Sequence, residues 1–170
     1  MARRKQGANS QTGRLRIVAG NWRSRLLDIA DVEGLRPTSE RIRETLFNWL
    51  SPHIHGAHCL DLFAGTGALG LEALSRGAGS AVFVERSSVA ARQLEKNIAE
   101  LGAITATVRI QSACDYLRSA PEARFDLIFL DPPFAADLRE ETCRLLAAQE
   151  LLADGALVYL CLLYTSDAAD

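Results

Sequence analysis

The stretch from residue 59 to residue 74 constrains the fold of this 170-residue chain more than any other. An apolar run interrupted by Asp61 enters a loop with glycines at positions 65, 67 and 70, and leucines at helical spacing follow. Glycine adopts the positive φ angles that such a turn needs and lets a ligand approach the backbone. The free N–H groups at the start of the helix add a partial positive charge. The pattern predicts a strand, a ligand-binding loop and a helix.

Strand-like and helix-like segments alternate through the rest of the chain. Residues 59–63, 81–85, 105–111, 126–130 and 156–160 are rich in the apolar residues of buried strands, and residues 69–76, 88–101, 115–119 and 138–149 have helical spacing. Strands separated by helices pair in parallel, and right-handed crossovers place ligands at the carboxyl edge of the sheet. We therefore expect an α/β fold with a doubly wound, mostly parallel, Rossmann-like sheet.

Composition and charge narrow the class of partner. The longest apolar run near the end, 156–164, is far shorter than the ~18 residues of a membrane helix. No apolar region follows the basic start, so we expect a cytoplasmic protein without a membrane partner. Residues 1–43 hold ten basic and four acidic residues, and the remainder holds nine and seventeen. An arginine-rich segment on an acidic domain favours nucleic acid, although a solubilising tail has the same composition.

Cysteine and histidine offer little chemistry in this chain. The four cysteines form no C-x-x-C pair, and the histidines at 53, 55 and 58 lack a carboxylate or cysteine at ligand spacing. We therefore expect reduced, buried thiols and no metal site.

The first 55 residues precede the alternating pattern. Residues 1–13 are polar and are expected to be disordered. Residues 15–27 are typical of two short strands about a Gly-Asn turn, with arginines at alternate positions and Trp22 at the tip. Arginine neutralises phosphates and an exposed aromatic ring stacks on bases, but Trp22 could equally pack the hairpin onto the domain.

A helix is expected after this hairpin. Thr38 or Ser39 can serve as its N-cap, and apolar residues follow at spacings of three and four. Ser51-Pro52 is expected to end it, which leaves the three histidines in a linker.

The loop at residues 65–70 fits the nucleotide-binding pattern G-x-G-x-x-G. Glu85 lies 20 residues after its first glycine, at the end of the second strand, where a carboxylate accepts both ribose hydroxyls. NAD dehydrogenases and S-adenosylmethionine methyltransferases share this pattern. Asp61 favours the second class, because a buried carboxylate needs a partner and suits a cationic amino-acid group better than a pyrophosphate. The alternative is a structural Asp61 that caps loop N–H groups. Ser112 or the Ala113 N–H, after the third strand, could bond an adenine edge.

Asp131-Pro132-Pro133-Phe134 follows the fourth strand and gives the most specific signal. The prolines fix φ near −65° and hold a rigid turn, so their carbonyls and the Asp131 side chain become acceptors with a fixed direction. An exocyclic NH₂ group of a base could donate two hydrogen bonds there while Phe134 stacks on the ring. Asp131 could also take the proton that the nitrogen releases. The alternative is a plain Asp-Pro turn that ends the strand.

These motifs, together with residues 16–23 and 36–48, resemble the RsmD family over roughly residues 14–160. Members of this family are class I methyltransferases that modify guanine N2 in small-subunit (16S) ribosomal RNA. The resemblance implies S-adenosyl-L-methionine as cofactor, and ribosomal RNA, the small subunit or its assembly intermediate as partner; we expect a monomer.

The resemblance, with the patterns above, gives three groups of site residues. The catalytic group at the target base is Asp131, Pro132, Pro133 and Phe134. The cofactor group is Asp61, Phe63, Gly65, Gly67, Glu85, Ser112, Ala113, Arg36 and Thr38. The RNA group is Arg16, Asn21, Trp22, Arg23, Arg25 and Arg41.

The resemblance fails at the end of the chain. Residues 161–170 do not match the antiparallel strand pair with which the family's sheet continues, so we expect a truncated frame with an unrelated tail. The expected organisation is a disordered tail (1–13), an RNA-contacting hairpin and helix (14–55), a methyltransferase core (56–160) and the unrelated tail (161–170). Three alternatives remain open at this point: an adenine-N6 or cytosine-N4 methyltransferase, a non-catalytic RNA-binding protein and an NAD-dependent oxidoreductase.

Overall fold

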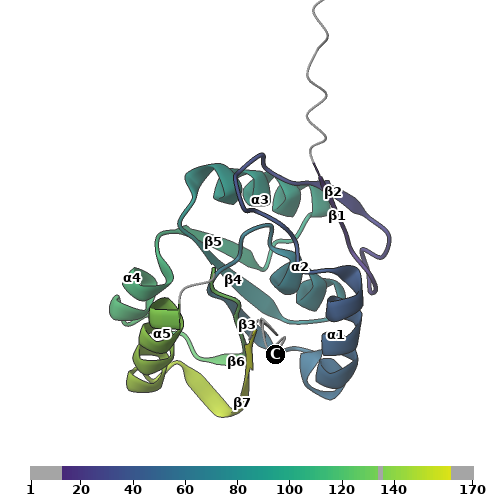
Figure 1. Ribbon diagram of the computed structural model, residues 1–170. Helices are drawn as coiled ribbons and strands as arrows, with labels where there is room; N and C mark the ends of the chain where they lie inside the picture. The colour runs from purple at the N-terminus through teal and green to yellow at the C-terminus, as the bar shows by residue number, and fades with distance from the viewer. Residues whose placement is uncertain (1–12, 134–135, 162–170) are drawn as a thin grey trace, which may run out of the picture.

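The computed structural model describes residues 13–133 and 136–161, which form a sheet covered by helices on both faces and a short N-terminal hairpin (Figure 1). The strands are β1 (Arg14–Arg16), β2 (Leu26–Asp28), β3 (His58–Asp61), β4 (Ser80–Glu85), β5 (Ala106–Ile110), β6 (Phe125–Leu130) and β7 (Leu152–Leu160). The helices are α1 (Glu40–Ile54), α2 (Ala68–Ser75), α3 (Ser88–Leu101), α4 (Ala113–Arg118) and α5 (Ala136–Ala148).

The main sheet has the strand order β5-β4-β3-β6-β7, and every neighbouring pair is parallel. The chain runs outward from β3 through β4 to β5, and then returns to the other side of β3 for β6 and β7. This reversal makes the β3/β6 boundary the switch point at which doubly wound sheets bind ligands. The expected α/β Rossmann-like fold is confirmed.

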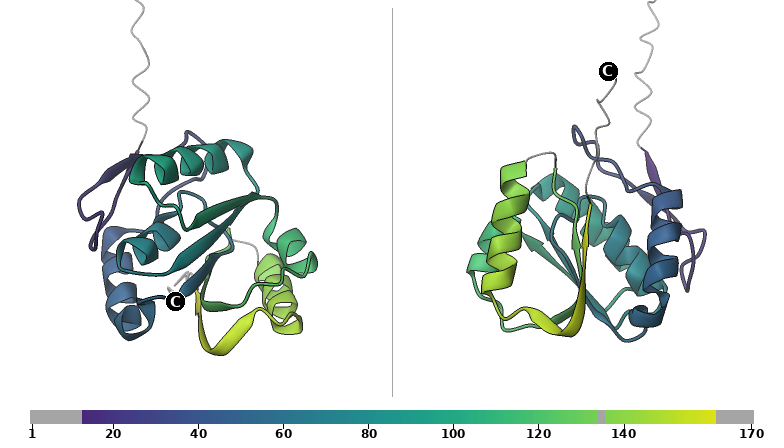
Figure 2. Two further views of the ribbon diagram at one scale, coloured as in Figure 1. Left: turned by 180° about the vertical axis from the view of Figure 1, so that it is seen from behind. Right: turned by 60° about the horizontal axis from the view of Figure 1, so that its bottom comes forward.

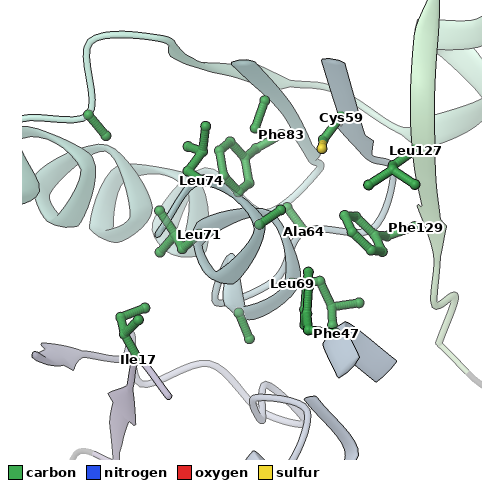
Figure 3. Close-up of a cluster of buried hydrophobic side chains, with 14 of the residues drawn as sticks. Ile17, Phe47, Cys59, Ala64, Leu69, Leu71, Leu74, Phe83, Leu127 and Phe129 are labelled. Atoms are coloured by element: carbon green, nitrogen blue, oxygen red, sulfur yellow. The ribbon is translucent and has the colours of Figure 1, made fainter. Parts of the chain in front are cut away.

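Two apolar layers hold the helices onto the sheet. Figure 2 shows α1 and α2 on one face and α4 and α5 on the other. Successive side chains of β3 point to opposite faces of the sheet and so contribute to both layers. Cys59 packs with Phe83 and Phe129 on the first face, whereas Leu60 packs with Ile128 on the second. Figure 3 shows that the first layer also receives Ile17 from the N-terminal segment, so the hairpin shares the core of the sheet.

Close contact between α2 and β4 depends on Gly70. A Cβ at this position would lie 2.3 Å from Cε1 of Phe83. We expect Gly70→Ala to lower the free energy of unfolding by about 1–3 kcal/mol through overpacking, although alanine in a helix otherwise adds up to about 1 kcal/mol. Urea unfolding measures the change.

A double-mutant cycle tests the cause of this loss. Phe83→Leu removes the ring that the new methyl group would contact. Gly70→Ala should therefore destabilise the Phe83→Leu protein less than it destabilises the wild type, so the two effects should not add. Gly13→Ala is the control for an added methyl group, because Gly13 has no positive φ and a Cβ on it would meet only Cδ1 of Ile29, at an ordinary contact distance of 3.7 Å. Additive effects of Gly70→Ala and Phe83→Leu would contradict the steric explanation.

The structure corrects two sequence-based boundaries. Helix α1 does not end at Ser51-Pro52 but continues to Ile54, because buried Leu50 and Ile54 hold its last turn on the core. His53 therefore lies in the helix rather than in a linker. Strand β7 begins at Leu152 instead of 156; a bulge at its start, where Gly155 has φ of 73°, shifts its register against β6.

The hairpin also differs from the expected one. Its strands are joined by residues 17–25, which we call the hairpin loop, and not by a two-residue Gly-Asn turn. The backbone of Asn21 and Trp22 bonds to α2 instead of to the opposite strand, and this pairing explains the longer loop. Trp22 is half-buried and packs against the core, which agrees with the packing alternative.

Candidate active site

Three acidic residues expected at the site lie at the carboxyl ends of adjacent parallel strands. Asp61 ends β3, Glu85 ends β4 and Asp131 follows β6. Strand β3 pairs with both β4 and β6, so the three groups meet at the switch point of the sheet. All three lie at the carboxyl edge of the sheet, as parallel pairing predicted.

The glycine loop between β3 and α2 has the left-handed backbone that its sequence indicated. Gly65 and Gly67 have φ angles of 55° and 80°, and Gly67 is the N-cap of α2. Its N–H donates to the Ala64 carbonyl at 2.7 Å, which closes the turn. Leu35 lies 3.2 Å from where a Cβ on Gly65 would be, so the segment that carries Arg36 and Thr38 passes beside this loop. Phe63 is half-buried under the loop and packs on the second apolar layer.

Glu85 connects the glycine loop to β4. Its carboxylate accepts hydrogen bonds from the Gly65 N–H at 2.7 Å and the Ser87 N–H at 2.9 Å. These bonds fix the carboxylate beside the glycine loop, at the position where a ribose would be recognised.

Asp61 is the buried acid of the site. It is 2% exposed, and its Oδ2 accepts a hydrogen bond from the Gly70 N–H at 3.2 Å. Burial raises the pKa of Asp61 to about 7, with smaller contributions from Asp131 and Glu85, against the lowering effect of the Gly70 bond. The carboxyl group therefore caps α2 as the structural alternative stated, and it also lacks a cation among the described residues. A positively charged ligand group would stabilise its ionised form.

Ser112 and Ala113 lie at the end of β5, where α4 begins. The Ser112 hydroxyl is the N-cap of this helix and accepts from the Asp115 N–H at 3.1 Å, while Ala113 is buried. The hydroxyl proton of Ser112 has no acceptor in the described part of the chain and could donate to a ligand.

Asp131, Pro132 and Pro133 lead away from β6 with Asp131 half-buried and Pro133 exposed. The neighbouring end of β7 is held by a bond from the Cys161 N–H to the Leu130 carbonyl. Burial, with Asp131 nearby, raises the pKa of Cys161. Phe134 lies outside the described residues.

The arginines expected to contact RNA divide into two sets. Arg16 makes a two-pronged ion pair with Glu40, with both N–O distances 3.0 Å, and Arg25 lies 3.9 Å from Glu100. Arg23 and Arg41 are exposed and have no ion pair within residues 13–133 and 136–161. Asn21 is exposed in the middle of the hairpin loop. A groove of about 430 Å³ separates the hairpin loop from α1, and Arg16, Arg23 and Arg76 are among the residues that line it.

Sequence reasoning missed a buried ionic cluster beneath this groove. Glu72, Arg43 and Arg76 join α2, α1 and the hairpin, and Glu72 is 0% exposed. One signal could have indicated it: Glu72 is the only charged residue in the otherwise apolar run from 68 to 75, and such a residue needs a partner when buried.

Other chemistries find little support in the described part of the chain. No group of three or more His, Cys, Asp or Glu residues there has metal-binding geometry. The four cysteines are free thiols; two are buried and two half-buried. None of the helices within the described ranges is both long and apolar enough to cross a bilayer.

Comparison with known proteins shows which proteins this chain is similar to. The sequence profile described as "Conserved hypothetical protein 95" matches residues 15–163. Ribosomal RNA small subunit methyltransferase D of Escherichia coli K12 is 48% identical over 92% of this chain and 78% of its own length. The protein of the same name from Haemophilus influenzae is 46% identical, over 87% and 78%. A solved Escherichia coli structure, yhhF, is 49% identical with a TM-score of 0.81 and covers 87% of this chain and 80% of its own.

Proposed function

Because this chain belongs to the "Conserved hypothetical protein 95" family, the RsmD family, we propose that it methylates guanine N2 in small-subunit ribosomal RNA with S-adenosylmethionine. It is a methyltransferase of ribosomal RNA. One observation carries the finer proposal: Asp61, Glu85 and Asp131 lie at the ends of neighbouring strands at the switch point, and the first two accept hydrogen bonds from the glycine loop and the first turn of α2. The substrate implies a cytoplasmic reaction, and we propose that the protein acts as a monomer.

The donor set fits S-adenosylmethionine. Asp61 offers a buried carboxylate to the amino group of the methionine part, and Glu85 offers two oxygens to the ribose. The Gly65 and Gly67 backbone leaves room for close approach, and Ser112 and Ala113 would face the adenine. We assign Arg36 and Thr38 to this space because their segment passes beside the glycine loop, and Phe63 because it is half-buried next to that loop. When bound, the cofactor supplies an electrophilic methyl group on a sulfonium.

Asp131 and the two prolines would hold the target amine. Proline carbonyls in a rigid turn and the Asp131 carboxylate accept hydrogen bonds, so an NH₂ group between them is held in one orientation. Most of the acceleration would come from this positioning. Asp131 would then accept the proton that the nitrogen loses. Phe134 is proposed to stack on the base.

The hairpin side of the molecule is proposed to contact RNA. Arg23 and Arg41 are exposed, have no ion pair among the described residues and would meet phosphates, whereas Arg16 and Arg25 are held by Glu40 and Glu100. Asn21 lies near Arg23 in the hairpin loop, and the half-buried Trp22 packs this loop onto the core.

Transfer of a tritiated methyl group onto small subunits that lack the modification tests this function. We expect label in the RNA of the subunit, and N2-methylguanosine after digestion to nucleosides. Label in N6-methyladenosine or N4-methylcytidine would favour the alternative amine targets. RNA binding without transfer would favour a non-catalytic protein. Tighter binding of NAD than of S-adenosylhomocysteine in calorimetry would favour an oxidoreductase.

A further inference from the structure

The hairpin loop is fastened to the C-terminal half of α2 by its backbone. The Val18 N–H donates to both Glu72 carboxylate oxygens, at 3.2 and 3.0 Å, and the Ala19 N–H donates to Oε1 at 3.2 Å. The Trp22 N–H donates to the Ser75 hydroxyl at 3.0 Å, and that hydroxyl donates to the Ala19 carbonyl at 2.6 Å. We call these bonds the loop anchor. They fix the position of the loop rather than its side chains.

The charge of Glu72 is neutralised from two sides. Arg76 donates to Oε1 at 3.1 Å, and Nη1 of Arg43 lies 3.5 Å from Oε2. Arg43, which is 1% exposed, also donates to the carbonyls of Thr38 and Arg16 at 2.9 and 2.8 Å. One buried pair therefore joins the hairpin, the segment beside the glycine loop and α2. A buried pair of this kind is weak evidence for stability, but removal of one partner alone leaves an uncompensated buried charge.

Gly20 brings the loop into direct contact with α2. Its φ is +88°, and a Cβ on it would lie 1.9 Å from the Ser75 carbonyl oxygen. The Asn21 N–H donates to this same oxygen at 2.8 Å. Any side chain at Gly20 would push the loop away from the helix.

Helix α2 has the glycine loop at one end and the loop anchor at the other. It begins after Gly67 and ends at Ser75, about 12 Å further at 1.5 Å per residue. All eight of its residues are buried, so the helix cannot move independently of the sheet. The distance between the glycine loop and the hairpin loop is therefore set by one rigid helix.

We propose that Glu72 and Ser75 are positioning residues for the RNA substrate: they hold the hairpin loop, with exposed Asn21 and Arg23, at a fixed distance from the glycine loop. The inference rests on the proposed function, because it gives the hairpin loop a role in holding RNA. The anchor keeps the loop preorganised, so RNA binding need not order it.

Gly20→Ala and Glu72→Gln test the anchor with small subunits as substrate and S-adenosylhomocysteine as binding probe. We expect KM for subunits to rise about tenfold or more in both variants. The displaced loop would no longer hold Asn21 and Arg23 where they contact the RNA. Both kcat and the Kd for S-adenosylhomocysteine should stay within about twofold, because the glycine loop is untouched. Amide exchange at Val18, Ala19 and Trp22 should become faster.

Matched controls separate positioning from general damage. Gly34→Ala adds the same methyl group at a φ of +77° but meets no atom within 4 Å, and Glu95→Gln removes an exposed carboxylate from α3. Both should leave KM unchanged. If Glu72→Gln fails to fold, Ser75→Ala removes anchor bonds without touching the buried charge.

Two results would overturn the positioning role. One is a wild-type KM in variants whose loop amides exchange faster. The other is a parallel loss of kcat, probe affinity and melting temperature, which would indicate general structural damage. Wild-type protein that does not methylate small subunits would instead contradict the proposed function, so the two failures are distinguishable.

Discussion

Replacing Asp131 by alanine is expected to lower kcat for methyl transfer about 10²–10³-fold, the usual cost of removing one fixed polar group from a reacting centre. Asp131 follows β6 at the switch point, half-buried beside the end of β7. Without its carboxylate the amine loses an acceptor that orients it and a group that takes its proton. Single-turnover transfer to small subunits measures the chemical step.

The same strand offers a matched control for this variant. Asp126 lies at the opposite end of β6, where its Oδ2 accepts from the His58 N–H at 2.8 Å. Asp126→Ala removes an equally half-buried carboxylate far from the glycine loop, so it should cost stability but leave kcat within about threefold. Binding of S-adenosylhomocysteine should be unchanged in both proteins. If the Asp131→Ala enzyme transfers methyl groups as fast as the wild type, Asp131 takes no part in the reaction.

The arrangement of the acidic residues could be read from the sequence for a physical reason. Parallel strands connected by helices must end at the same edge of the sheet. The carboxyl ends of the runs 59–63, 81–85 and 126–130 therefore had to lie at one edge of the sheet, and the strand order β4-β3-β6 makes them neighbours. Motifs singled out Asp61, Glu85 and Asp131, and this rule predicts that they share one edge. The left-handed turn at Gly65 and Gly67 follows from glycine's tolerance of positive φ.

Contacts between segments far apart in the chain could not be predicted. The hairpin loop bonds to Glu72 and Ser75, more than fifty residues later, and no local pattern encodes this pairing. Arg43 was counted as part of a basic surface, but its guanidinium is buried on Glu72. Pro52 was expected to end α1, yet burial of Ile54 outweighs the loss of one helix bond. In each case tertiary packing overrode a local signal.

Cofactor affinity should depend on the ionisation of Asp61. Its pKa is raised from 3.8 to about 7, so the carboxyl group of the free protein is mostly protonated at pH 6 and mostly ionised at pH 8. An ammonium group binds the ionised form. The Kd for S-adenosylhomocysteine should therefore fall about tenfold per pH unit up to about pH 7 and level off above it. Calorimetry between pH 5.5 and pH 8.5 measures this profile.

Asp61→Asn should flatten that profile and weaken binding at pH 8 by about 10–100-fold, the loss of a charge-assisted contact. Although Asp61→Asn weakens cofactor binding, it should raise the free energy of unfolding at pH 7 and above. Because the folded protein keeps a proton that the unfolded chain releases above about pH 4, wild-type stability falls as pH rises from about 4 to 7, and Asn removes this loss. Asp126→Asn, which keeps an acceptor for the His58 N–H, should alter neither profile. A Kd that is independent of pH in the wild-type protein would show that Asp61 does not meet the cationic end of the cofactor.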